Sequence, residues 1–220
     1  MSLDLSSWSR PDRGALFVVT GASGTGKTTL VKEALRVLPD VGWSVSATTR
    51  AAREGEVDGR DYHFVSHERF AELVDAGQML EWAEVYGNRY GTLREPVEAA
   101  LQAGRSILLE IDYQGAQQVR AALPEAVSIF VLPPDLDTIE ARLRGRATDS
   151  EAIIARRIGD AHLQIAHCHE FDYLVVNEDL GAAHDQFQAV LVAELLRRAR
   201  QGSLVRSFVR SAEGRAPIAR

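Results

Sequence analysis

Residues 15–30 read Ala-Leu-Phe-Val-Val-Thr-Gly-Ala-Ser-Gly-Thr-Gly-Lys-Thr-Thr-Leu, and this stretch decides the fold. The apolar run over residues 15–20 predicts a buried strand, and apolar residues spaced three and four apart after Lys27 predict a helix. The turn between them, residues 21–28, fits G-x-x-x-x-G-K-[ST], the phosphate-binding loop. At the usual glycine frequency of about 7%, such a match arises by accident on the order of 0.01 times in a chain of this length. The sequence therefore predicts a nucleotide triphosphate site.

The residue types of this loop suit the binding of a polyphosphate. Glycines let successive backbone N–H groups turn inward around the phosphates, and the helix that follows adds the positive end of its dipole. Lys27 is expected to reach the β- and γ-phosphates, and the Thr28 hydroxyl to bind Mg²⁺. Lys27 is one of only two lysines among 25 basic residues. A chain that otherwise uses arginine therefore has a lysine, with its compact ammonium, at the phosphate position. The expected nucleotide contacts are Gly21, Ala22, Ser23, Gly24, Thr25, Gly26, Lys27, Thr28 and Thr29.

Composition bounds the class of protein. A chain of 220 residues, 45% hydrophobic and 25% charged, suits one globular body with an inserted lobe. A single cysteine, Cys168, excludes an internal disulfide framework. The segment Met1 to Arg13 has no apolar core of a signal peptide, and no apolar run approaches the ~18 residues that span a bilayer. We expect a soluble cytoplasmic protein without a membrane partner, whose oligomeric state, monomer or homo-oligomer, stays open.

Charge is unevenly distributed along the chain. Residues 197–220 hold seven arginines and one acid and so carry +6, which leaves −12 on the rest of a chain whose net charge is −6. A basic end of this kind can contact nucleic acid or a membrane surface. We expect instead a frayed, solvated tail over residues 201–220, and no nucleic acid partner.

Strands that alternate with helices predict an α/β fold of the P-loop NTPase type, a doubly wound parallel sheet with the phosphate loop at its carboxyl edge. Residues 44–93 break this rhythm with short strands and predict an inserted small α+β lobe, in which Ser66 caps a helix and residues 88–92 form a turn or a strand edge. Strands are predicted at 15–20, 43–46, 106–112, 127–132 and 173–177, and helices at 30–38, 96–103, 114–122, 136–144, 151–167 and 183–200.

Two sets of arginines accompany the loop. Arg50 and Arg53, with Tyr62 and Tyr90 downstream, suit a second and smaller phosphate, although surface arginines and core tyrosines have the same pattern. The second set brackets residues 145–150, as in an arginine-bearing lid that closes over transferring phosphates, or in a solvated helix face. Its members are Arg142, Arg144, Arg146, Arg156 and Arg157.

Acidic and histidine residues offer further candidates. Glu110 and Asp112 end an apolar strand, where an acid orients Mg²⁺ or its waters, or merely caps the next helix. The group His162, His167, Cys168, His169 and Glu170 lacks the spacing of a metal site, and we do not expect it to bind one.

Seven blocks between residues 15 and 200 together resemble the guanylate kinases. This match of seven blocks in order is far more specific than a match to the phosphate loop alone. They are GASGTGKT (21–28), SVSATTR (44–50) followed by Arg53, GEVDGRDYHFV (55–65), EWAEVYGNRYGT (81–92), LLEIDYQG (108–115), RLRGR (142–146) and VVNEDL (175–180).

The resemblance implies Mg²⁺-assisted transfer of the γ-phosphoryl group of ATP to GMP, and likewise to dGMP. By this analogy Lys27 and Thr28 serve ATP and Mg²⁺, with Glu110 toward the metal. The GMP phosphate would be held by Arg50, Arg53, Tyr62 and Tyr90, and guanine by Ser46, Glu81, Thr92 and Asp112. Arg142, Arg146 and Arg157 would close on the phosphates, and Asn177 would lie near adenine.

The implied organisation has a flexible arm (1–13), a core (14–43 and 94–200), a GMP lobe (44–93), a lid (about 142–157) and a basic tail (201–220). Three positions depart from the family pattern: Ala52 replaces a proline, Ala147 a glycine and Thr92 a frequent serine. A carboxylate such as Glu81 can accept the N1–H and N2–H₂ donors of guanine, whereas adenine would leave it unpaired. The alternatives are a P-loop kinase for another monophosphate or a phosphorylated sugar, and a non-catalytic guanylate-kinase-like binding module.

Overall fold

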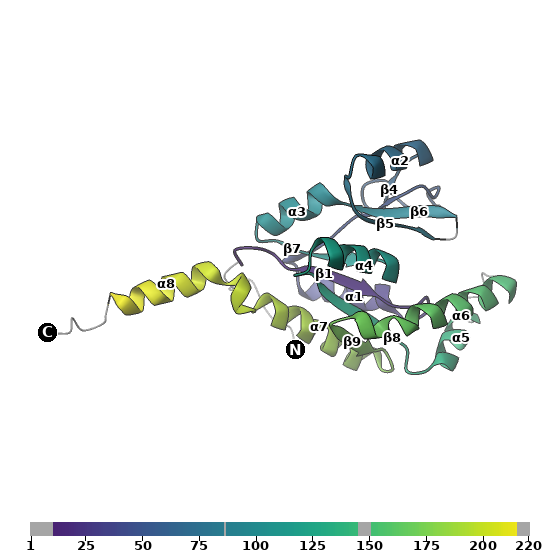
Figure 1. Cartoon of the computed structure of the whole chain (residues 1–220). Helices are drawn as coiled ribbons and strands as arrows, with labels where there is room; N and C mark the ends of the chain where they lie inside the picture. The colour runs from purple at the N-terminus through teal and green to yellow at the C-terminus, as the bar shows by residue number, and fades with distance from the viewer. Residues whose placement is uncertain (1–10, 86, 145–150, 215–220) are drawn as a thin grey trace.

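A computed structural model describes residues 11–85, 87–144 and 151–214, without the side chains of residues 152 and 153. Figure 1 shows a helix-covered parallel sheet with a smaller second sheet above it. Arg146, Ala147, Tyr86 and the ends of the chain (1–10 and 215–220) lie outside the described residues. Among the described helices, none has the length and apolar character that crossing a bilayer requires.

The central sheet has five parallel strands in the order β2-β7-β1-β8-β9. β1 lies in its middle and is buried along its whole length, as its apolar sequence predicts. The strand predicted at residues 43–46 is wrong in position, because β2 ends at Trp43, where its pairing with Leu108 stops. The strand bounds are Leu16–Thr20 (β1), Val41–Trp43 (β2), Ser106–Glu110 (β7), Val127–Leu132 (β8) and Tyr173–Val176 (β9).

Alternate residues of β1 point to opposite faces of the sheet, and each face has its own helices. Phe17 and Val19 pack with α1 and α7, whereas Leu16 and Val18 pack with α3 and α4. The helices α5 and α6 pack on the phosphate loop through Ala22. The helix bounds are Lys27–Val37 (α1), Arg94–Gln102 (α3), Tyr113–Ala122 (α4), Leu136–Arg144 (α5), Glu151–Ala166 (α6) and Leu180–Leu195 (α7).

The inserted lobe has its own sheet, in the order β4-β3-β6-β5, and a core around Phe70. Residues 88–93 form a full inner strand of this sheet and not a turn or edge, because Gly91 has no side chain and lets β5 approach closely. Ser66 caps α2 as predicted, by accepting the backbone N–H of Arg69. The bounds are Ala47–Thr48 (β3), His63–Phe64 (β4), His67–Asp75 (α2), Met79–Val85 (β5) and Asn88–Leu93 (β6).

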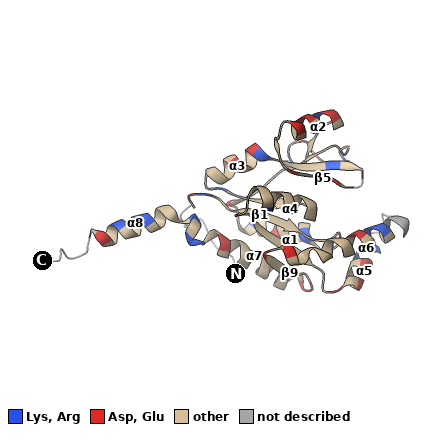
Figure 2. Ribbon diagram, in the orientation of Figure 1, with Lys and Arg blue, Asp and Glu red and all other residues tan. Residues whose placement is uncertain are grey.

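The C-terminal segment differs from the prediction. The last core helix ends at Leu195, not at Arg200, because the chain turns to bury the Arg200 guanidinium against the carbonyls of Glu194, Gly14 and Glu125. The predicted frayed tail is wrong for its described part, since Gly202–Glu213 form a helix, α8, that projects from the body (Figure 1). Figure 2 shows its basic residues along the ribbon.

Short links complete the chain. Residues 198–200 form a 3₁₀ helix, η2, and residues 168–170 another, η1. Asp12, in the predicted flexible arm, accepts the backbone N–H of Ser203 at 2.8 Å and pairs with Arg206 at 3.1 Å. The start of the described chain is therefore tied to the base of α8. The bounds of the arm, the core, the lobe and the lid remain predictions.

Candidate active site

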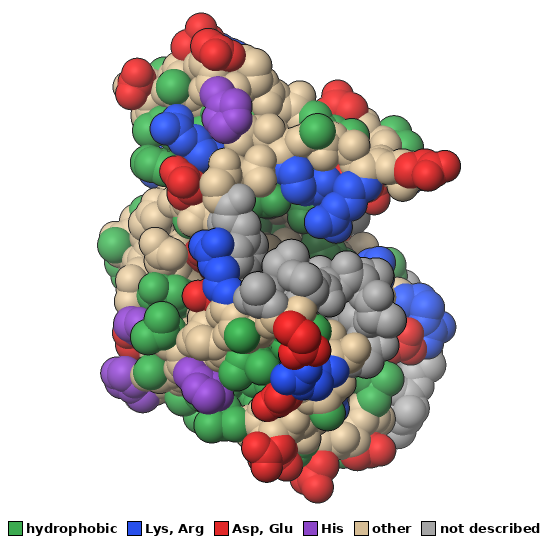
Figure 3. Space-filling model, turned by 90° about the vertical axis from the view of Figure 1, so that its right-hand side faces the viewer, with side chains coloured by type: hydrophobic (Ala, Val, Ile, Leu, Met, Phe, Trp, Pro, Cys, Tyr) green, Lys and Arg blue, Asp and Glu red, His purple; other side chains and the backbone are tan. Residues whose placement is uncertain are grey.

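One cleft of about 740 Å³ lies between the sheet core and the inserted lobe. In Figure 3 the molecule is hollowed between its upper and lower parts, and Lys and Arg side chains gather on both sides of the hollow. The cleft brings together residues from segments that are far apart in the sequence. From the predicted site it is lined by Gly21, Ser23, Lys27, Thr28, Ser46, Arg53, Tyr62, Glu81, Tyr90, Glu110 and Asp112.

The phosphate loop joins β1 to α1, and its glycines have backbone conformations that other residues rarely adopt. Gly24 and Gly26 have φ of 91° and 87°. The Lys27 ammonium folds back over the loop and donates to the carbonyls of Gly21 and Ala22. The loop is closed internally by Thr25, whose hydroxyl donates to the Ala22 carbonyl at 2.9 Å. Lys27 and Thr28, the first residues of α1, line the cleft, so the positive end of the helix dipole lies there, as anion binding requires.

Two residues that the sequence predicts near the nucleotide, Asn177 and Arg142, form hydrogen bonds with the phosphate loop. The buried Asn177 amide donates to the Thr25 carbonyl at 2.7 Å, and a Cβ on Gly26 would lie 2.3 Å from this amide nitrogen. The Arg142 guanidinium donates to the carbonyls of Asn177 at 3.1 Å and Gly24 at 3.4 Å. Asn177 and Arg142 also line a separate shallow hollow beside Gly24 and Gly26. In this structure they brace the loop, a contact that the sequence pattern does not reveal.

The predicted metal residues lie together. The Thr28 hydroxyl donates to Glu110 Oε1 at 2.7 Å, across the gap between α1 and the end of β7. A hydroxyl and a carboxylate are hard oxygen ligands, and Mg²⁺ is commonly held by one or two such groups together with substrate phosphates. The two residues therefore fit a magnesium ion. Asp112, the other predicted acid, caps α4 by accepting the backbone N–H of Gly115 at 2.8 Å.

A buried carboxylate lies at the lobe end of the cleft. Glu81 on β5 is only 4% exposed and accepts the Thr92 hydroxyl at 2.6 Å. Burial raises the pKa of Glu81 to about 7, and the hydrogen bond from Thr92 opposes that rise. Gly115 makes room for this carboxylate, since a Cβ there would lie 2.3 Å from Glu81 Oε2. Burial also raises the pKa of Asp112, whose charge contributes to the raised pKa of Glu81.

The predicted monophosphate residues gather on the lobe. Arg53, Tyr62 and Tyr90 line the cleft, and the two tyrosine rings meet edge to face with centroids 6.0 Å apart. The Arg50 guanidinium lies 5.3 Å from the centroid of the Tyr62 ring. It is paired at 2.8 Å with Glu56, which lines the cleft.

Sequence reasoning missed several lining residues. Glu56, Asp61, Lys32 and Gln164 line the cleft, but each is an ordinary charged or polar residue in its segment of sequence. The position of Glu56 three residues after Arg53, in the loop of the predicted phosphate site, is the sequence feature that could have indicated it. Of the predicted lid arginines, Arg142 braces the loop and Arg157 is half-buried on α6, and Arg146 lies outside the described residues.

The histidine cluster has structural partners. His167 pairs with Glu170 at 2.6 Å and stacks on Tyr113 with ring centroids 4.4 Å apart. Gln117 of α4 donates to the same carboxylate at 2.8 Å. Within the described part of the chain, no group of three or more His, Cys, Asp or Glu side chains is placed to hold a metal ion.

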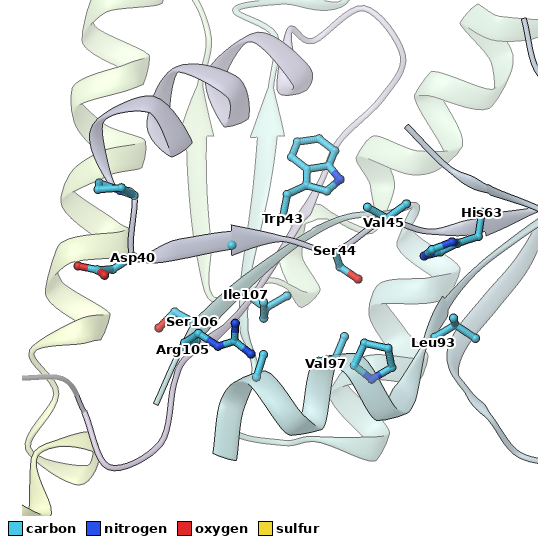
Figure 4. Close-up of a pocket in the computed structure, with 14 residues that line it drawn as sticks. Asp40, Trp43, Ser44, Val45, His63, Leu93, Val97, Arg105, Ser106 and Ile107 are labelled. Carbon is cyan, nitrogen blue, oxygen red and sulfur yellow. The ribbon is translucent and has the colours of Figure 1, made fainter. Parts of the chain in front are cut away.

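A second hollow of about 510 Å³ lies where the chain passes between core and lobe. Figure 4 shows Trp43 and Ser44 at the end of β2, His63 from the lobe, and Val97 of α3 around it. It is lined by none of the predicted site residues.

The fold and the cleft are those of a P-loop phosphotransferase with an inserted lobe. The family model for guanylate kinase matches residues 13–194. A guanylate kinase of Aromatoleum aromaticum is 52% identical over 188 residues, covering 86% of this chain and 92% of that protein. One of Rhodopseudomonas palustris is 49% identical over 199 residues, covering 90% of each.

A solved structure supports the same conclusion. The crystal structure of guanylate kinase from Anaplasma phagocytophilum is similar at a TM-score of 0.72 and 35% identity, covering 86% of this chain and 90% of that one. The chain therefore belongs to the guanylate kinase family of enzymes, as its motifs predict.

Proposed function

We propose that the cleft between core and lobe is the active site in which ATP phosphorylates GMP. The reaction of the family, and of this chain, transfers the γ-phosphoryl group of ATP to GMP and yields ADP and GDP. The observation that carries the site assignment is the Gly21–Thr28 loop and the buried Glu81–Thr92 pair at opposite ends of one cleft. A triphosphate and a purine monophosphate bound at these ends would face one another.

The loop would bind the ATP phosphates through its N–H groups and Lys27. The Lys27 ammonium would give up its hydrogen bonds to the Gly21 and Ala22 carbonyls and donate to phosphate oxygens instead. Thr28 and Glu110 would hold Mg²⁺, with phosphates and water as its other ligands. The ion supplies charge neutralisation on the phosphate oxygens. Asn177 and Arg142 would keep the loop rigid, on the side where adenine is expected.

At the lobe end, ionised Glu81 would accept the N1–H and N2–H₂ donors of guanine. Thr92 orients this carboxylate, and Ser46 and Asp112 complete the rim of the slot. Adenine would present an acceptor at N1 and leave a buried carboxylate unpaired, which costs on the order of 10⁴ or more in discrimination. Arg53, Arg50, Tyr62 and Tyr90 would bind the phosphate of GMP, and dGMP would fit the same contacts.

The chemical step needs no general base from the protein. A phosphate oxygen of GMP is already a nucleophile, so catalysis consists of alignment and of neutralising charge on the moving phosphoryl group. Lys27 and the lid arginines Arg142, Arg146 and Arg157 would supply that positive charge.

ATP turnover measured separately with GMP, dGMP, AMP, UMP and a sugar phosphate tests the acceptor site. We expect turnover with GMP and dGMP that exceeds turnover with the other acceptors. A preference for AMP or a sugar phosphate would overturn the assignment of Glu81, and absence of turnover with every acceptor would favour a binding module.

A further inference from the structure

An acidic side chain lies inside the proposed GMP phosphate site. Glu56 lines the cleft with Arg53, Tyr62 and Tyr90, and its side chain is 20% exposed. Arg50 Nη2 donates to both of its carboxylate oxygens, at 2.8 and 3.0 Å. A carboxylate among groups that would bind an anion opposes binding by its charge, so its presence calls for an explanation.

The same carboxylate joins the two arginines of the loop. Besides the Arg50 guanidinium, Glu56 accepts the backbone N–H of Arg53 at 2.8 Å. One side chain therefore fixes the side chain of the first arginine and the main chain of the second. The hydrogen bond from Arg50 lowers the pKa of Glu56, so the carboxylate is ionised over the neutral range.

The remaining contacts of Arg50 hold its guanidinium in one plane. Nη1 donates to the Ala51 carbonyl at 2.8 Å, and the group lies over the rings of Tyr62 and Phe64. A guanidinium has five N–H donors in a rigid fork, and besides Glu56 and Ala51 that of Arg50 also interacts with Tyr90. A pre-oriented arginine binds phosphate with less loss of side-chain entropy than a free one.

We propose that Glu56 is a positioning residue for the GMP phosphate: it orients Arg50 and the Arg53 backbone so that the loop is formed before substrate arrives. The proposal rests on the proposed function of the cleft. If Glu56 instead competes with the phosphate for Arg50, its removal would tighten GMP binding, so the two roles predict opposite signs.

Steady-state kinetics of Glu56→Ala test the sign. We expect KM for GMP to rise at least about tenfold, with KM for ATP changed by less than about twofold, because the contacts of Glu56 lie on the lobe. Glu56→Gln, which keeps an acceptor of the same shape, should give a smaller rise. Glu33→Gln is the matched control, since Glu33 pairs with Arg36 on the surface of α1. A fall in KM for GMP, or equal changes for both nucleotides, would overturn the proposal.

A double-mutant cycle with Arg50→Ala separates positioning from a structural role. If Glu56 acts in part through Arg50, Glu56→Ala should raise KM for GMP by a smaller factor when Arg50 is already absent, and the remaining rise reports the contact of Glu56 with the Arg53 main chain. An undiminished effect in that background would overturn the positioning role. If Arg50→Ala alone leaves KM for GMP unchanged, the proposed phosphate site itself is wrong.

Discussion

The two ends of the cleft would bind phosphate by different means. The core end would use main-chain N–H groups of one continuous turn, Gly21–Thr28, which follows a fully buried strand. The lobe end would use side chains from separate segments, with Arg50 and Arg53 near β3, Tyr62 beside β4 and Tyr90 on β6. The first site is local and needs glycines, whereas the second needs the whole lobe to fold and a carboxylate, Glu56, to join its parts.

Removing the Lys27 ammonium from the core end should have the largest effect. Lys27→Ala is expected to lower kcat by at least about 10²-fold, as for the loss of a contact to a transition-state charge, while the protein stays folded. Single-turnover kinetics and thermal unfolding measure the two quantities. Lys27→Arg keeps the charge but replaces a compact ammonium by a planar fork, so it should also be impaired. Rates like those of the wild type in the alanine variant would remove Lys27 from the mechanism.

A pair of glycine substitutions compares the two loops directly. Gly26→Ala combines φ of 87° with a Cβ 2.3 Å from the Asn177 amide, so it should destabilise by several kcal/mol and weaken ATP binding. Gly55→Ala in the lobe loop has φ of 86° but nothing within 4 Å, so only the backbone strain of about 1–2 kcal/mol remains. Urea unfolding and ATP titration of both variants test this. Equal losses of stability would show that the packing of Asn177 against the loop is unimportant.

Guanine binding should depend on pH through Glu81. Its pKa of about 7 in the free protein means that protonation removes the acceptor for the guanine donors. Between pH 7 and pH 6, KM for GMP should therefore rise about fivefold more in the wild type than in Glu81→Gln. Any rise in Glu81→Gln reports the titration of the GMP phosphate itself. The difference between wild type and Glu81→Gln, measured at each pH, tests this. A parallel rise in both would contradict it.

The same carboxylate should destabilise the free protein at high pH. Its pKa is raised above the unfolded value of 4.5, so its contribution to stability is present below pH 4.5 and is lost as pH rises through about 7. Glu81→Gln should accordingly raise the free energy of unfolding at pH 8 by up to about 3 kcal/mol relative to its effect at pH 4. Chemical unfolding without nucleotide at the two pH values measures this, and a pH-independent difference would contradict it.

The sequence predicts local features well and long-range contacts poorly. The strand at β1, the glycine-rich turn that joins it to α1 and the cap at Ser66 follow from neighbouring residues, and the structure confirms them. The buried Arg200 and the helix α8 could not be predicted, because the partners of Arg200 are carbonyls near both ends of the chain.

The contacts of the candidate site also include one that the sequence predicts and one that it does not. Thr28 and Glu110 are 82 residues apart, and their contact is predictable because both lie at the carboxyl edge of neighbouring parallel strands. The pairing of Glu56 with Arg50 has no such regularity behind it. A loop acid is an unremarkable residue in sequence, and only the folded lobe gives it a partner.

The most direct test of the account compares GMP with inosine monophosphate, which lacks the 2-amino donor, as acceptors for wild type and for Glu81→Gln. Glu84→Gln is the matched control, because Glu84 lies on the same strand and is exposed. If Glu81 selects guanine, the wild type and the control should prefer GMP by at least about 10²-fold in kcat/KM, and Glu81→Gln should keep less than about a tenth of that preference. An unchanged preference in Glu81→Gln would contradict the account.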